Sequence, residues 1–126
     1  MEFWLLAGLG VYLLQVYAAA AIYLPTEGMA THLGGRDSLP EKGIMAGRAD
    51  KALANMKENL PVFLTLGLLA MVVEGADSAL AAQGAMIWVL ARAAYFFAYL
   101  ATIPYLRSFI WGISLVGLVM MLFSVL

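Results

Sequence analysis

The sequence predicts an all-α integral membrane protein in which four transmembrane helices form a bundle. Hydrophobic residues make up 64% of the 126 positions. Only 12% are charged, whereas a soluble domain has roughly a quarter. Uncharged apolar stretches recur along the chain, and a membrane crossing needs about 20 such residues. We therefore expect a single domain over residues 1–126 with about four crossings.

The first span is predicted from Phe3 to Leu24, a run without charge that would form a helix of about 33 Å. A cleaved signal peptide is the alternative, because Ala18 to Ala20 resembles a cleavage site. No Lys or Arg precedes the apolar run, which favours a span. A polar connection rich in glycine and proline is predicted from Pro25 to Met45.

The second span is predicted as a long helix from about Ala46 to Val73. Its first half is rich in good helix formers. The uncharged stretch between Glu58 and Glu74 has only 15 residues, which is short for a crossing, so the helix is expected to begin in water. Pro61 lacks an N–H group and predicts a kink.

Two further spans are predicted from Ser78 to Ile103 and from Tyr105 to Leu126, with Pro104 between them. Five of the seven Lys and Arg residues flank the first connection, and another follows the third span. The positive-inside rule therefore places these two connections in the cytoplasm. Both termini are then expected on the opposite side of the membrane.

Polar side chains gather on one face of the second and of the third predicted span, at helical spacings of three and four residues, and two more begin the fourth span. The predicted topology puts all three groups in the cytoplasmic half of the membrane. The candidate site residues are Arg48, Lys51, Asn55 and Glu58 on the second span, Arg92, Tyr95 and Tyr99 on the third, and Arg107 and Ser108 on the fourth.

Cations outnumber Glu58 in this set, and such an excess is costly in a low dielectric unless an anion joins it. We expect a small anionic ligand with an amine for Glu58. Arg107 and Ser108 begin a helix, whose N-terminus favours an oxyanion or thiolate. Lowering a thiol pKa from about 8.5 by two units takes about 2.7 kcal/mol. Two structural alternatives are an Arg92–Glu58 salt bridge that locks the helices and an Arg107 anchored at the headgroups.

Two stretches resemble the family of membrane-associated proteins in eicosanoid and glutathione metabolism, called MAPEG. The first is GRADKALANMKENLPVFL, from Gly47 to Leu64, and the second is RAAYFFAYLATIPYLRSFIW, from Arg92 to Trp111. The loop Gly35 to Asp37 is similar to that of bacterial members. The number, order and length of the spans also agree, so the resemblance covers the whole chain.

The resemblance implies a homotrimer in a bacterial inner membrane, with loop 25–45 cytoplasmic and both termini periplasmic. It also implies a transferase or peroxidase, similar to microsomal glutathione transferase, that uses glutathione as cosubstrate against lipophilic electrophiles. Arg107 would stabilise the thiolate, and Ser108 matches a proposed catalytic serine. Glu58 would take the amino group of glutathione. The other implied glutathione contacts are Lys51, where the family's enzymes commonly have arginine, and Asn55, Arg92, Tyr95 and Tyr99.

Other functional classes have little support. His32 is the only histidine and has no partner at metal-ligand spacing, so no metal site is expected. The chain has no basic tract for nucleic acid. One alternative function stays open: a non-catalytic membrane protein whose polar cluster locks the helices or binds another small anion.

Overall fold

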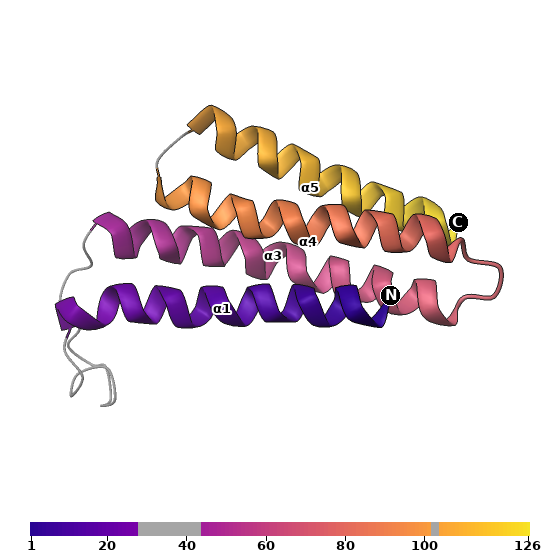
Figure 1. The fold of residues 1–126 in the computed structure, drawn as a ribbon, viewed down its shortest axis with the longest axis horizontal. Helices are drawn as coiled ribbons and strands as arrows, with labels where there is room; N and C mark the ends of the chain where they lie inside the picture. Colours follow the sequence, from indigo (N-terminus) through magenta and orange to yellow (C-terminus); the bar gives the residue numbers. More distant parts are fainter. Residues whose placement is uncertain (28–43, 102–103) are drawn as a thin grey trace.

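A computed structural model describes residues 1–27, 44–101 and 104–126. Over these residues the chain forms four helices: α1 (Glu2–Glu27), α3 (Ile44–Val72), α4 (Ser78–Leu100) and α5 (Pro104–Val125). The N- and C-termini lie at the same end of the bundle as the turn between α3 and α4 (Figure 1). This all-helical arrangement confirms the predicted fold class.

The helix boundaries differ from the predicted ones by a few residues. Helix α1 continues to Glu27, so Pro25 lies inside it rather than opening the connection, and α3 begins at Ile44. Helix α3 includes Pro61, as expected. The predictions for His32 and for the loop 35–37 fall outside the residues that the structure describes.

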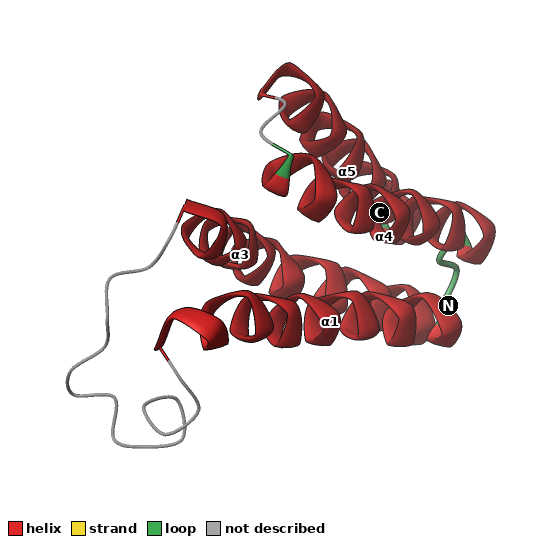
Figure 2. Cartoon of the chain, turned by 60° about the vertical axis from the view of Figure 1, so that its left-hand side comes forward, coloured by secondary structure: helices red, strands yellow, loops and turns green. Residues whose placement is uncertain are grey.

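The helices pack as two pairs, with α1 beside α3 and α4 beside α5 (Figure 2). The backbones of α4 and α5 touch where Gly84 meets Gly117. A Cβ atom added to either glycine would lie 2.6 Å from the carbonyl oxygen of the other. Small residues allow this close approach, which is a common basis of helix packing in membranes.

An aromatic stack at the centre of the bundle joins the two pairs. The rings of Phe63 on α3 and Trp88 on α4 lie parallel, with centroids 4.0 Å apart, and both side chains are fully buried. Gly8 of α1 makes room for Phe63, because a Cβ atom there would lie 2.5 Å from its ring. Three helices are thereby held in register.

The outer surface of the bundle is mostly apolar, with large exposed side chains on every helix. By length and composition, α1, α4 and α5 are each able to cross a membrane. Helix α3 is more polar, and its mean hydropathy is lower than that of these three helices. This agrees with the short uncharged stretch that the sequence offers for this span. Exposed hydrocarbon is expected where lipid replaces water.

Asp77 caps α4 at the end of the bundle that carries the termini. Its Oδ1 accepts a hydrogen bond of 3.1 Å from the backbone N–H of Leu80, and its own N–H donates to the carbonyl of Ser124 at 2.8 Å. We expect Asp77→Ala to lower the free energy of unfolding by about 1 kcal/mol, because the cap is lost. Denaturant titration in detergent measures the change, and Asp77→Ser should restore most of it. Equal losses in both variants would contradict a capping role.

Candidate functional site

A polar cavity of about 210 Å³ lies between α3, α4 and α5. Arg107 and Ser108 place it at the end of the bundle where α5 begins. Its lining comprises Asn55, Tyr95, Arg107, Ser108 and Trp111. Four of these five are candidate residues from the sequence, so side chains from three separate spans do converge on one cavity.

Asn55 is held in place by its neighbour one turn along α3. The side-chain amide of Asn59 donates to the backbone carbonyl of Asn55 at 2.8 Å and to its Oδ1 at 3.4 Å. These contacts hold α3 and the Asn55 side chain together where Asn55 lines the cavity. An asparagine amide can both donate to and accept from a ligand there.

Two arginines and two tyrosines form a continuous row along α4 and α5. The guanidinium carbon of Arg92 lies 4.5 Å from the ring centroid of Tyr95, and that of Arg107 lies 4.5 Å from the centroid of Tyr99. The two tyrosine rings meet edge to face at 5.8 Å. Cation–π contacts of this kind hold a guanidinium in place without neutralising its charge. Arg107 therefore stays positioned and charged beside the cavity.

Arg92 is fully buried next to Tyr95, and it does not pair with Glu58. Within the described part of the chain, none of its three guanidinium nitrogens has a hydrogen-bond partner. Glu58 is exposed on the outside of α3. The reason is helical geometry: Glu58 lies two residues from the fully buried Met56, which turns it about 160° away from the core. The structural alternative, an Arg92–Glu58 salt bridge that locks the helices, is therefore not formed within a single chain.

Arg48 and Lys51 also lie outside the cavity lining. The Nη1 of Arg48 donates to the carbonyl of Leu100 at 3.4 Å, where it satisfies a free carbonyl at the end of α4. Lys51 is exposed on the same outer side of α3 as Glu58. The structure thus divides the candidate residues into a cavity lining, a buried guanidinium, a helix-end contact, two exposed charges and Tyr99, whose ring contacts Arg107.

The electrostatics of the cavity favour an anion. Arg107 lies in the first turn of α5, where the free N–H groups and the helix dipole add partial positive charge. No ion pair of Arg92 or Arg107 with a carboxylate occurs among the residues described. Positive charge without a carboxylate partner favours an anionic ligand at this position. The residues that line the cavity therefore fit a small anion.

Comparison with known protein families matches the MAPEG family over residues 1–126. The chain belongs to the MAPEG family. A search of curated proteins finds no match to the chain. The family match confirms the resemblance that the two motifs of this MAPEG protein indicate.

The sequence pattern did not indicate two residues that the structure places beside cavities. Trp111 is not among the candidate residues from the sequence, but it lines the polar cavity. Its spacing from Arg107 and Ser108, four and three residues, was the available signal. Gln15 is almost completely buried in the middle of α1. A polar side chain in the middle of an apolar span is itself a signal.

Proposed function

We propose that this MAPEG protein is a glutathione-dependent membrane enzyme of the transferase or peroxidase type, acting on lipophilic electrophiles. The observation that carries the proposal is the cavity in which Arg107, still charged, lies beside Ser108 at the start of α5. This arrangement suits a thiolate better than any neutral ligand, because both the guanidinium and the helix end stabilise negative charge.

The chemistry assigned to these residues is thiolate formation followed by attack on an apolar substrate. Arg107 and the N–H groups of the first turn of α5 stabilise the sulfur anion, and the thiol proton passes to solvent. The Ser108 hydroxyl donates a further hydrogen bond to the sulfur. In a transferase reaction the thiolate forms a C–S bond. In a substitution the leaving group departs with the electrons of the broken bond, and in an addition the electrons of the broken π bond take up a proton. Asn55 and Tyr95 would position the bound thiol for attack, and this positioning would account for much of the rate enhancement.

We further propose that a homotrimer completes the site. The cavity of about 210 Å³ is smaller than the roughly 300–1,000 Å³ of typical ligand sites. Lys51 and Glu58 lie exposed on the outer side of α3, the helix that also supplies Asn55 to the cavity. A second copy packed against this side would enclose them. Glu58 could then take the amino group of glutathione and Lys51 a carboxylate.

The remaining assignments belong to the same proposal. Arg48 and Arg92 would add positive charge for the carboxylates, and Tyr99 would keep Arg107 in place. The protein would lie in a bacterial inner membrane, with loop 25–45 in the cytoplasm and both termini in the periplasm. The electrophile would reach the sulfur from the lipid surrounding the helices.

Thermal unfolding with glutathione tests binding directly. A ligand at a hundred times its dissociation constant stabilises the folded state by about 2.7 kcal/mol. We expect such a shift for the protein in detergent, and a reduced one for Glu58→Gln. An analogue of glutathione with a methyl group in place of the thiol should bind as well, which separates peptide binding from thiolate formation.

The same measurement distinguishes the non-catalytic alternative. If the row of Arg92, Tyr95, Tyr99 and Arg107 only locks the helices, Arg92→Met would lower the stability of the ligand-free protein, and glutathione would not raise the stability of the unaltered protein. That pair of results would contradict the proposed enzyme.

A further inference from the structure

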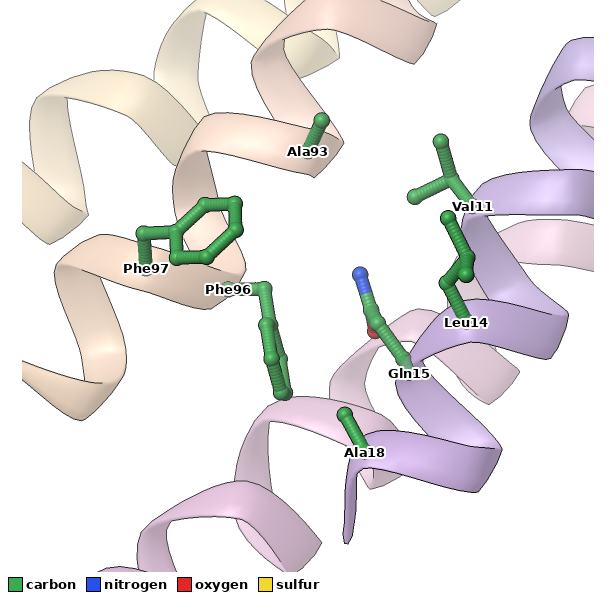
Figure 3. A pocket seen from close by; sticks show the side chains of 7 residues that line it. All are labelled: Val11, Leu14, Gln15, Ala18, Ala93, Phe96 and Phe97. Atoms are coloured by element: carbon green, nitrogen blue, oxygen red, sulfur yellow. The ribbon is translucent and has the colours of Figure 1, made fainter.

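A second cavity, of about 280 Å³, lies between α1 and α4. It is on the far side of α4 from the polar cavity, since Ala93 and Tyr95 are two residues apart and point about 160° away from each other. Figure 3 shows its lining side chains. They are Val11, Leu14, Gln15 and Ala18 of α1 and Ala93, Phe96 and Phe97 of α4.

Gln15 is the only polar side chain in this lining, and its hydrogen-bonding capacity is largely unused. The side chain is 3% exposed. Its Nε2 lies 3.5 Å from the carbonyl oxygen of Arg92, at the outer limit of a hydrogen bond. Its Oε1 has no partner among the described residues. A buried amide left in this state carries a desolvation cost that a suitable ligand would remove.

The cavity opens toward the lipid rather than toward water. Leu14 and Phe97 are 72% and 69% exposed on the apolar outer surface, whereas Phe96 is buried. In Figure 3 the amide nitrogen of Gln15 points into the space between the two helices, and the amide oxygen is turned away from it. A ligand that enters here therefore comes from the hydrocarbon and meets one polar group at the inner end.

We propose that this cavity binds a lipophilic alcohol or phenol whose single hydroxyl group pairs with Gln15. A hydroxyl both donates and accepts. It can accept from Nε2, and a half-turn of the terminal amide brings the covered Oε1 to the cavity, where it accepts from the hydroxyl. A cavity of about 150 Å³ holds benzene, so the volume of about 280 Å³ suits a molecule of two fused rings. This site is independent of the proposed glutathione chemistry.

Matched probes test the hydroxyl requirement. Binding of 2-naphthol and 2-methoxynaphthalene is measured by fluorescence titration of the protein in lipid nanodiscs, with protein-free nanodiscs subtracted. The methoxy probe cannot donate to Oε1. We expect 2-naphthol to bind about five- to tenfold more tightly, the difference that one neutral hydrogen bond gives. Gln15→Leu should abolish this preference. Equal affinities in the unaltered protein, or a preference that survives Gln15→Leu, would overturn the proposal.

Cavity-filling variants provide the controls. Ala93→Phe fills the cavity and should weaken both probes, a test that does not require Gln15→Leu to fold. A cavity of about 290 Å³ on α4 and α5 serves as the matched apolar site, lined by Leu80, Leu115, Val116, Val119, Met120 and Phe123. Val116→Trp should leave the preference for 2-naphthol unchanged. Unaltered binding in Ala93→Phe would show that the probes bind elsewhere and would refute the site.

Discussion

Replacement of Arg107 by methionine is expected to remove most of the thiolate from bound glutathione at neutral pH. The guanidinium beside Tyr99 is the charge that lines the polar cavity. A free thiol with a pKa near 8.5 is about 3% ionised at pH 7. A thiol whose pKa is lower by two units is about 75% ionised at the same pH. Loss of the whole stabilisation would therefore cut the thiolate roughly 25-fold.

Ultraviolet absorbance of the thiolate, followed as pH is varied, measures this effect. A lowered thiol pKa places the rise in absorbance at lower pH, so Arg107→Met should move the rise toward alkaline pH, by at most about two units because the helix N-terminus and Ser108 remain. Arg107→Lys is the matched control, because lysine keeps the positive charge and lacks only the planar guanidinium group. This variant should retain part of the lowering of the thiol pKa. An unchanged titration in Arg107→Met would assign thiolate stabilisation to another group.

The largest structural effect is expected at the contact between α4 and α5. A Cβ atom added to Gly117 would lie 2.6 Å from the carbonyl oxygen of Gly84 and 2.9 Å from the backbone nitrogen of Trp88. Both obstacles are backbone atoms, which cannot rotate away as a side chain can. Gly117→Ala must therefore push the two helices apart, at a cost of about 1–3 kcal/mol.

Gly112 on the same helix is the matched control for this prediction. An added Cβ atom there meets no described atom within 4 Å. Gly112→Ala should therefore be neutral or slightly stabilising, because alanine favours a helix by about 1 kcal/mol over glycine. Unfolding in a graded detergent series compares the two variants. Equal stabilities would show that the α4–α5 contact does not depend on the absence of a side chain.

The fold could be predicted from the sequence because its determinants are local. Uncharged runs indicate α1, α4 and α5, and good helix formers around Asn55 indicate α3. The convergence of Asn55, Tyr95 and Arg107 was also predictable, since alternating helix directions bring these positions to the same end of the bundle. Axial position follows from topology alone.

The rotation of each helix about its own axis could not be predicted in this way. Rotation depends on which side chains pack in the core, and Met56 and Phe63 turn α3 so that Glu58 faces outward. The same dependence buries Arg92 and places Trp111 in the cavity. Spacing shows which residues share a face, but packing decides which neighbour that face meets.

The polarity of α3 has a consequence for biogenesis. Helices α1, α4 and α5 are each long and apolar enough to cross a bilayer, whereas α3 is more polar. Helix α1 packs along α3 through the contact of Gly8 with Phe63. We therefore expect α3 to insert together with α1 as a helical hairpin rather than by itself.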